Sequence, residues 1–260
     1  MHSSQPRKAA LIVEYDGTSY RGFQYQPGVP TVQSEIETAI HRLTLEKTRV
    51  KAAGRTDVGV HAKGQAVAFL TRSNLSPDSL LSGLNHFLPS DIAVKKACYV
   101  DASFDPRRHA VSRVYGYSIL NSESPSPLRE RYSARVAESL DEDAMRLALD
   151  WMVGEHDFAL LSGPVPPGKS TVRRIFAGAV DRDDDTVRFQ VEANAFLPHQ
   201  MRRIAGLLVA IGNGRVSPEA VPATLHGRTN PWSTGLARTM PPQGLCLLQV
   251  NYKDFPPNGY

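Results

Sequence analysis

The order of strand-like and helix-like segments along this 260-residue chain repeats once, and this repeat constrains the fold most strongly. The first half reads as strand, helix, strand, strand, helix, strand, and the second half follows the same order. Each half therefore predicts a βαββαβ unit of the ferredoxin-like kind. We expect an α+β protein in which the two tandem units join into one extended mixed or antiparallel sheet with helices on one face.

The first unit is predicted from apolar spacing and from turn residues. Thr31 is a good N-cap for a helix whose apolar positions run from Val32 to Leu43, and a second helix has Leu80 and Leu88 on one face. The four strands expected in this half are residues 8–15, 49–53, 65–70 and 92–100.

The second unit is predicted in the same way. Residues 101–110 interrupt the periodicity, so we place the domain boundary there, with an N-terminal half of residues 1–104 and a C-terminal half of residues 105–260. Ser139–Glu142 has the form of a capping box that opens a helix, which Gly154 can end. The other expected elements are a strand at 111–120, a hairpin of 171–180 with 186–196, helices at 199–211 and after Ser217–Pro218, and a strand at 245–252.

Composition excludes several classes of protein. An apolar fraction of 41% is enough for a packed core. The apolar run at residues 204–211 is far shorter than the roughly 20 residues of a membrane helix. The N-terminal apolar stretch at residues 9–13 is too short for a signal peptide. Cys98 and Cys246 form no CxxC pair, so we expect a cytoplasmic protein without a disulfide framework or a thiolate metal site.

The charge is compatible with a nucleic-acid partner. Thirty Lys and Arg residues face 26 Asp and Glu residues, which gives a net charge of +4. Arginine makes up 22 of the 30 basic residues, and its guanidinium group binds phosphate and stacks on bases. Codon bias explains the same excess equally well, so the charge alone does not identify a partner.

The segment GRTDVGVHA, residues 54–62, concentrates chemically useful side chains in one short loop. Gly54 and Gly59 allow a sharp turn that presents Asp57 at its tip. A carboxylate in this position can act as a nucleophile or as a general base, and Arg55 would favour its ionised form. The alternative is structural: Asp57 would only cap backbone N–H groups in an Asx-turn.

This loop resembles the signature loop of the tRNA pseudouridine synthase A family. The opening YDGT…GFQYQP also resembles the family's YDGT…GWQxQP, with Phe23 where the family usually has Trp. The same order of blocks continues along almost the whole chain. Further matching blocks are Thr31–Gln33, Arg113–Tyr117, Gly154–Phe158, Thr171–Ile175, Phe196–Arg202 and Pro241–Leu245.

The resemblance implies a function and a set of site residues. By position, Asp57 matches the catalytic aspartate, and Arg55 and Arg202 match arginines that hold and orient it. Tyr115 matches a tyrosine that stacks on the target uracil, and Leu245 matches an apolar residue of the base pocket. The implied activity is isomerisation of uridine to pseudouridine in the anticodon stem-loop of tRNA, by a homodimer.

The implied reaction breaks the N1–C1′ bond and forms a C5–C1′ bond, with no redox step, so we expect no cofactor. The carboxylate could attack C1′, as in retaining glycosidases, add at C6 of the ring, or act as a base at C2′ through a glycal. The target base must be flipped out of its helix, which costs a few kcal/mol, and stacking on Tyr115 would return roughly 1–3 kcal/mol. The sequence leaves the three routes open.

Other candidate sites are weaker. His61, His156 and His199 are far apart and lack ligand spacing, so we expect no metal. The segment GPVPPGK, residues 163–169, lacks the spacing of a P-loop, so we expect no nucleotide cofactor. Several arginines could contact the RNA backbone, although each could equally be an ordinary surface residue: Arg107, Arg108, Arg173 and Arg203.

Two functions from other classes remain as alternatives. One is a non-catalytic RNA-binding module on the same scaffold, which the presence of Asp57 disfavours. The other is a carboxylate-dependent N-glycosidase, which would need a second carboxylate as general acid, and the loop offers none.

Overall fold

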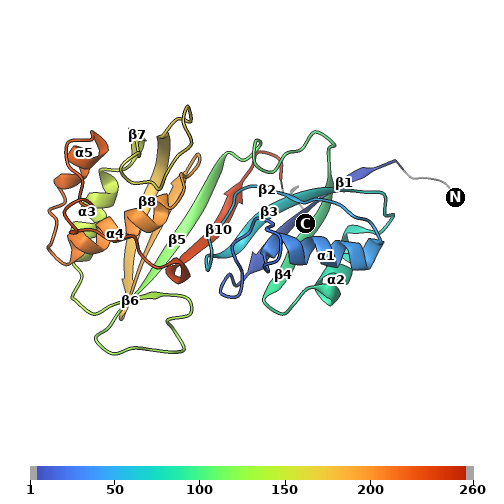
Figure 1. Ribbon diagram of the computed structural model, residues 1–260, viewed down its shortest axis with the longest axis horizontal. Helices are drawn as coiled ribbons and strands as arrows, with labels where there is room; N and C mark the ends of the chain where they lie inside the picture. Colours follow the sequence, from blue (N-terminus) through green and yellow to red (C-terminus); the bar gives the residue numbers. More distant parts are fainter. Residues whose placement is uncertain (1–4, 256–260) are drawn as a thin grey trace. The chain divides into compact units, whose positions relative to one another are not determined.

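The computed structural model describes residues 5–255 and is shown as a ribbon in Figure 1. The chain divides into two compact units, one made of Met1–Val111 with Leu247–Tyr260 and the other of Ser112–Cys246. Both units combine strands with helices, which confirms the predicted α+β class. None of the helices within residues 5–255 is long and apolar enough to cross a bilayer.

The first unit is built around β1, which lies between β3 and β4 and pairs with both in antiparallel fashion. Residues 9–11 of β1 are fully buried, as expected for a strand in the middle of a sheet. Helices α1 and α2 pack against each other and lie over one side of this sheet (Figure 1). The elements are β1 (Arg7–Tyr15), α1 (Val32–Thr44), β2 (Lys51–Ala52), β3 (His61–Thr71), α2 (Pro77–Phe87) and β4 (Ile92–Val100), with β10 (Leu245–Asn251) beginning just before the chain returns to this unit.

The start of α1 is confirmed in detail. The Thr31 hydroxyl accepts a hydrogen bond from the Ser34 amide at 3.2 Å, and the Ser34 hydroxyl accepts one from the Thr31 amide at 3.1 Å. This reciprocal arrangement is a capping box, which satisfies two amide groups that a helix otherwise leaves unpaired. It fixes the direction in which the chain enters α1.

The second unit has the strand order β5-β9-β8-β7, with every neighbouring pair antiparallel and β6 parallel to β5. Helix α3 packs against α4 and β8. The predicted hairpin is confirmed, with its turn at Asp184–Asp185. The elements are β5 (Ser112–Asn121), β6 (Ala134–Val136), α3 (Glu142–Asp150), β7 (Gly154–Asp157), β8 (Val172–Asp183), β9 (Thr186–Ala193), α4 (Gln200–Gly212), α5 (Ala220–Leu225) and the 3-10 turn η1 (Pro242–Gly244).

Two predictions about the start and the end of α3 were wrong. The N-cap is Asp141, whose carboxylate accepts a hydrogen bond from the Ala144 amide at 2.9 Å, and Ser139 is an exposed residue before the helix. An aspartate is as good an N-cap as a serine, and the sequence offered both. Gly154 does not end the helix either, because it begins β7 with a φ of +112°.

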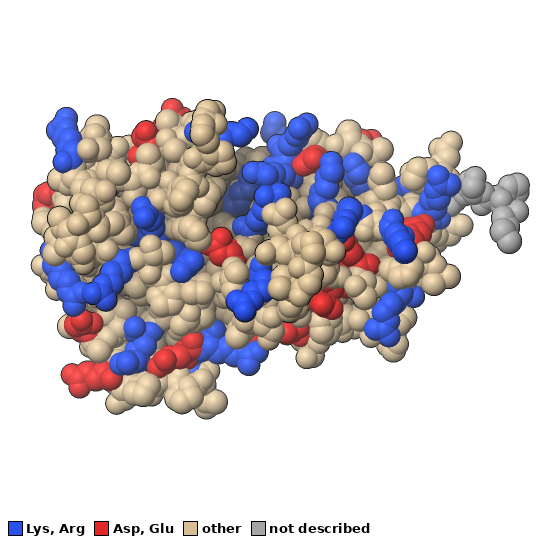
Figure 2. All heavy atoms as spheres, in the orientation of Figure 1, with Lys and Arg blue, Asp and Glu red and all other residues tan. Residues whose placement is uncertain are grey.

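Charged side chains are distributed over the surface of both units. Figure 2 shows Lys and Arg atoms over the whole of the drawn face, with Asp and Glu atoms interspersed among them. The charges on this face therefore do not by themselves locate a nucleic-acid site. The location of the site therefore has to come from individual side chains.

Candidate functional site

The loop that carries Asp57 connects β2 to β3 within the first unit. The Val60 amide donates to the Asp57 carbonyl at 3.2 Å, which closes a turn at residues 57–60. Gly59 has a φ of +75°, a conformation that favours glycine, whereas Gly54 does not have a positive φ. The side chain of Asp57 is partly exposed at this turn. The structure thus places the carboxylate at a loop tip, as the sequence predicted.

Thr56, the residue before Asp57, is held on two sides. Its hydroxyl lies 2.7 Å from the hydroxyl of Tyr15, at the end of β1, and its carbonyl accepts a hydrogen bond from the Phe23 amide at 3.1 Å. Thr56 is only 6% exposed, so both hydrogen bonds are shielded from water. Backbone anchors on each side of a residue fix where its neighbour points. The position of Asp57 is therefore set by β1 and by the loop that follows it.

Gly22 shows how closely that second loop approaches the Asp57 turn. Its φ is +86°, and a methyl group on it would lie 2.9 Å from the Thr56 carbonyl oxygen. Glycine is required here for two reasons, the backbone angle and the lack of space. This close approach was not predicted, although the GFQ segment was part of the family resemblance.

His61 and Asp16 close the base of the same loop. The Gly17 amide donates to Nδ1 of His61 at 3.1 Å, and an Oδ1 atom of Asp16 lies 3.1 Å from that nitrogen. The Asp16 carboxylate also accepts hydrogen bonds from the amide and the hydroxyl of Thr18. His61 is 6% exposed, and its contact with the Gly17 amide joins the start of β3 to the loop that follows β1.

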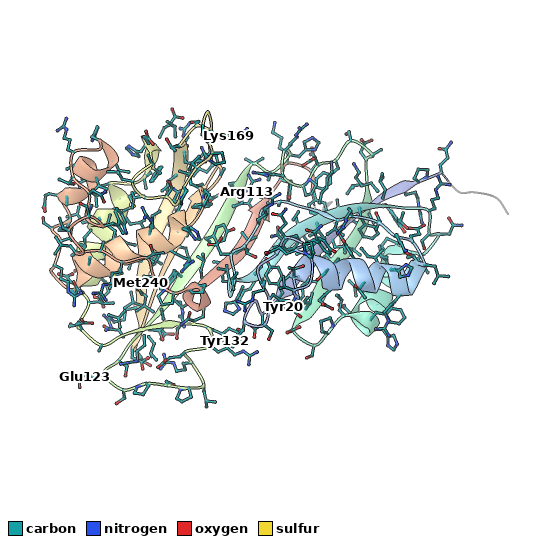
Figure 3. All side chains as sticks on the ribbon, viewed as in Figure 1. Tyr20, Arg113, Glu123, Tyr132, Lys169 and Met240 are labelled. Atoms are coloured by element: carbon teal, nitrogen blue, oxygen red, sulfur yellow. The ribbon has the colours of Figure 1, made fainter. Side chains whose placement is uncertain are left out.

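Tyr20, labelled in Figure 3, joins the loop after β1 to Asp91, the residue before β4. Its hydroxyl donates to Oδ1 of Asp91 at 2.5 Å. Burial and the hydrogen bond to Asp91 raise the pKa of Tyr20 well above its ordinary value. Tyr20 is therefore a neutral hydrogen-bond donor at neutral pH, and its role is structural.

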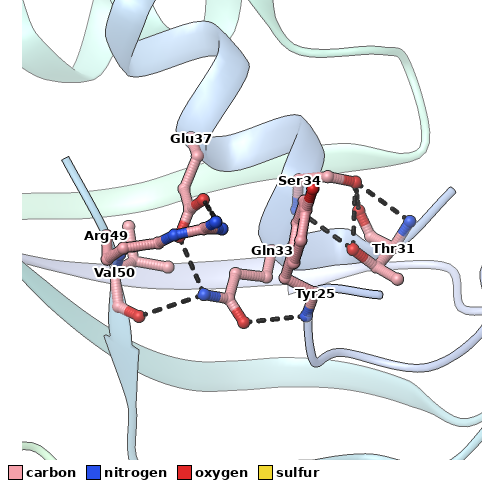
Figure 4. Close-up of polar contacts among 7 residues, drawn as sticks. All are labelled: Tyr25, Thr31, Gln33, Ser34, Glu37, Arg49 and Val50. Carbon is pink, nitrogen blue, oxygen red and sulfur yellow. Dashed lines mark hydrogen bonds and ion pairs between the residues drawn. The ribbon is translucent and has the colours of Figure 1, made fainter. Parts of the chain in front are cut away.

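A polar network on α1 holds the strand that leads into the Asp57 loop (Figure 4). Oε1 of Glu37 accepts a hydrogen bond from the Val50 amide at 3.0 Å, and its Oε2 pairs with Arg49 at 2.7 Å. Gln33 donates to Glu37 at 2.8 Å and accepts from the Tyr25 amide at 2.9 Å. One helix thus ties down both the chain before β2 and the loop before α1.

In the second unit, Tyr115 and Arg202 come from neighbouring elements. Tyr115 lies on β5, partly exposed, and its ring meets that of Phe196 edge-on with centroids 5.0 Å apart. Arg202 lies on α4 and donates from Nε to the Met240 carbonyl at 2.8 Å, while the Met240 amide donates to the Arg202 carbonyl at 3.0 Å. Met240 is labelled in Figure 3.

Leu245 follows the segment that Arg202 holds, and it is 6% exposed. A residue that the sequence analysis missed, Tyr117, donates from its hydroxyl to the Pro241 carbonyl at 2.7 Å. Burial raises the pKa of Tyr117, so its hydroxyl stays protonated. The alternation of tyrosines in RVYGY was the available signal, because residues two apart on a strand share a face. Arg202 and Tyr117 together position the chain just before Leu245.

The four arginines predicted to contact RNA fall into two groups. Arg107 and Arg108 are exposed and line a cavity of the first unit. Arg173 donates from Nη1 to two carbonyls, those of Ser170 and Val172, and Arg203 donates to the Leu160 carbonyl. Burial lowers the pKa of both Arg173 and Arg203. Each arginine of this second pair thus makes at least one hydrogen bond to a backbone carbonyl of the protein.

The described part of the chain contains no cluster of potential metal ligands. Within residues 5–255, no group of three or more His, Cys, Asp or Glu side chains could hold an ion. The chemistry that the described site offers is that of a carboxylate at an anchored turn, together with the cations of an adjacent cavity.

Comparison with known proteins places the chain in a family. The chain matches the family model described as tRNA pseudouridine synthase over residues 11–107 and 148–253. It is 41% identical over 246 residues to a protein named tRNA pseudouridine synthase A from Geotalea daltonii, with 95% of this chain and 100% of the relative covered. The corresponding protein of Myxococcus xanthus is 40% identical over 248 residues, with 95% of this chain and 92% of the relative covered.

Two of the solved structures that match share much less sequence identity with this chain. A Cbf5-Nop10-Gar1 complex gives a TM-score of 0.37 at 10% identity, covering 94% of this chain and 60% of the other chain. The archaeal box H/ACA sRNP Nop10-Cbf5 complex gives a TM-score of 0.34 at 12% identity, covering 78% of this chain and 44% of the other.

Proposed function

Because the chain belongs to the tRNA pseudouridine synthase family, we propose that it isomerises uridine to pseudouridine in the anticodon stem-loop of tRNA, with Asp57 as the nucleophile. The observation that carries this proposal is the anchoring of the Asp57 turn. Its neighbour Thr56 is held by Tyr15 and by Phe23, while Asp57 is a partly exposed residue. A fixed and accessible carboxylate is what attack on a nucleotide requires.

The reaction needs no group beyond the side chains and the substrate. The N1–C1′ bond breaks, the uracil turns, C5 bonds to C1′ and the C5 hydrogen leaves as a proton. The Asp57 carboxylate would attack C1′ or C6, or would take the proton from C2′ on the route through a glycal. In each case the Asp57 carboxylate starts the reaction.

The second unit supplies the residues that we propose receive the base. Tyr115 is partly exposed on β5, and a stacked base would gain about 1–3 kcal/mol from such a ring. That gain offsets much of the few kcal/mol that flipping the nucleotide costs. Leu245 would line the base pocket. Arg202 would orient Asp57, and its hydrogen bond to the Met240 carbonyl holds the guanidinium in one direction.

We also propose which half of the chain supplies which site residues, that the protein is a homodimer, and that it is located in the cytoplasm. The half up to residue 104 would supply the carboxylate, and the half from residue 105 would supply the stacking tyrosine and its arginine. The protein would act as a homodimer on tRNA, in the cytoplasm. These three statements rest on family membership.

The proposal is tested by release of tritium from tRNA labelled with [5-³H]uridine. Wild-type protein should release tritium without freeing uracil, and Asp57→Asn should abolish release while tRNA affinity stays nearly unchanged. Asp78→Asn is the matched control, because Asp78 is an exposed carboxylate at the start of α2. Release by Asp57→Asn at the wild-type rate would refute the mechanism. Free uracil would favour the N-glycosidase, and binding without either product would favour the RNA-binding module.

The proposed role of Arg202 has its own test. Arg202→Leu should reduce the rate of tritium release far more than it reduces tRNA affinity, because an orienting residue acts on the reacting carboxylate. Equal losses of rate and affinity would instead make Arg202 a phosphate contact. Tritium release at saturating tRNA and equilibrium binding separate the two.

A further inference from the structure

A cavity of about 410 Å³ opens in the first unit beside the turn that carries Asp57. Its walls come from β2 and the two residues that follow Ala53, from the start of α1 with the loop before it, and from residues 105–108. Four of the lining residues are cationic and one is anionic: Lys51, Arg55, Arg107 and Arg108 against Asp105. We propose that this cavity binds a backbone phosphodiester of the RNA close to the reacting nucleotide, a subsite that rests on the proposed function.

The excess of positive charge is not cancelled by the one carboxylate. Oδ2 of Asp105 lies 3.7 Å from Lys51 Nζ, and the Lys51 side chain is 74% exposed, so this ion pair is loose and screened. Oδ1 of Asp105 accepts hydrogen bonds from the amides of Arg107 and Arg108 at 2.9 and 3.1 Å. Asp105 thus shapes the turn that presents both arginines.

The carboxylate keeps its charge at neutral pH. Burial on its own raises the pKa of Asp105, but the amides of Arg108 and Arg107 and the charge of Lys51 outweigh burial, and the net direction is downward. The four cations therefore always face one negative charge, and the cavity stays net positive. Replacing Asp105 by asparagine would raise that charge without removing the acceptor that shapes the turn.

A second cavity of the same unit allows the charged lining of the two cavities to be compared. It is of similar volume, about 390 Å³, and it is also lined by cations, among them Arg49. There, however, Glu37 pairs with Arg49 at 2.7 Å, and the Arg49 guanidinium lies over the Tyr25 ring at 4.2 Å. The most basic group of the second cavity is thus already bound within the protein. The second cavity has two Lys and Arg side chains against one carboxylate, whereas the cavity beside the Asp57 turn has four against one.

The location of the cavity identifies its ligand as a part of the substrate. Arg55 lines the cavity and lies two residues from Asp57, so their Cα atoms are at most about 7.6 Å apart. A nucleotide held at Asp57 therefore brings its flanking phosphates within reach of this wall. Guanidinium and ammonium groups gathered in a concave site attract phosphate oxygens. A backbone phosphodiester meets both requirements.

The first test measures tRNA binding in the Asp57→Asn background, where no turnover interferes. Lys51→Gln should weaken binding about threefold and reduce the slope of log affinity against log salt by about one, the effect of one lost phosphate contact. Asp105→Asn should tighten binding, which a purely structural role would not do. Lys95→Gln is the matched control, because Lys95 is also an exposed strand lysine paired with one carboxylate, Glu14, at 3.3 Å. Equal effects of Lys51→Gln and Lys95→Gln would overturn the proposal.

The second test locates the phosphate. Single neutral methylphosphonate linkages are introduced one at a time along an anticodon stem-loop RNA, and each RNA is titrated against the Asp57→Asn protein with and without Lys51→Gln. One or two linkages near the target uridine should weaken binding to the parent about threefold and leave binding to the Lys51→Gln variant unchanged. Additive losses at every linkage would overturn the subsite. If the wild type releases tritium but the affinity losses from the linkages and from Lys51→Gln are additive, the subsite alone is refuted. If the losses are not additive at one or two linkages and the wild type releases no tritium, the proposed function alone is refuted.

Discussion

The hydroxyl of Tyr15 lies 2.7 Å from the hydroxyl of Thr56, and this buried contact joins the last residue of β1 to the residue before Asp57. The ring of Tyr15 also lies 6.2 Å from that of Phe23, whose amide holds the Thr56 carbonyl. The side chain of Tyr15 therefore links β1, which lies between β3 and β4, to the turn that carries Asp57. Any change to this contact should act on the direction of the Asp57 carboxylate.

Tyr15→Phe removes one hydroxyl from that contact. We expect a loss of about 1 kcal/mol in the free energy of unfolding, because a buried hydrogen bond is lost while the ring stays in place. We also expect the rate of tritium release at saturating tRNA to fall, because Thr56 can then shift. Tyr99→Phe is the control, since Tyr99 donates to the Leu75 carbonyl at 2.8 Å within the same unit. If the two variants have similar stabilities and only Tyr15→Phe releases tritium more slowly, the contact between Tyr15 and Thr56 positions Asp57. Equal rates of tritium release in the two variants would contradict this role.

Gly22→Ala should displace the Asp57 turn. The new methyl group would lie 2.9 Å from the Thr56 carbonyl oxygen, and the alanine would also have to adopt the positive φ of +86°. Gly28→Ala separates the two effects, because Gly28 has a φ of +77° and no atom within 4 Å of the added methyl. Both variants should lose about 1–2 kcal/mol from the backbone angle, measured by urea unfolding. Only Gly22→Ala should also lose tritium release, and full activity in Gly22→Ala would show that the turn tolerates the shift.

The sequence predicted the strands and helices that repeat their pattern over many residues. β4 spans residues 92–100 as predicted, and Thr31 caps α1 as expected. Short elements were missed, because β6 and β7 have only three and four residues, too few for a period to be recognised. The predicted strand 49–53 shrinks to Lys51–Ala52, since Val50 gives its amide to Glu37 instead of a neighbouring strand.

Motifs in the sequence predicted the residues of the candidate site. They did not predict the long-range contacts that hold those residues in place. Asp57 at a loop tip follows from two glycines around an acid, which a sequence shows directly. The anchoring of Thr56 by Tyr15 joins positions 41 residues apart, and no local pattern carries that information. The same holds for the role of Tyr117 in holding Pro241, since the two residues are 124 positions apart. Long-range contacts of this kind appear only in the folded chain.

Glu37 should stabilise the protein mainly by accepting the hydrogen bond of the Val50 amide, and its negative charge should contribute little. Glu37→Gln keeps an oxygen for the Val50 amide and loses only the pair with Arg49, whose side chain is 63% exposed. Such an exposed ion pair contributes less than about 1 kcal/mol. Glu37→Ala leaves a buried amide without its acceptor, and we expect a loss of about 1–3 kcal/mol. Urea unfolding of both variants checks this, and equal losses would mean that the ion pair, not the acceptor, is important.

Gly206 on α4 permits the chain before Leu245 to pack against the helix. A methyl group on Gly206 would lie 1.7 Å from the Arg238 carbonyl oxygen, a backbone atom that cannot turn aside. Helix propensity alone would make Gly206→Ala stabilising by about 1 kcal/mol, whereas overpacking costs typically 1–3 kcal/mol or more. We expect the clash to win, so thermal unfolding should occur at a lower temperature than in the wild type. Gly214→Ala, which meets no atom within 4 Å at a φ of +73°, is the control for backbone strain. Since Met240 and Leu245 lie just beyond Arg238, Gly206→Ala should also reduce tritium release, and a more stable, fully active variant would show that this segment moves away without consequence.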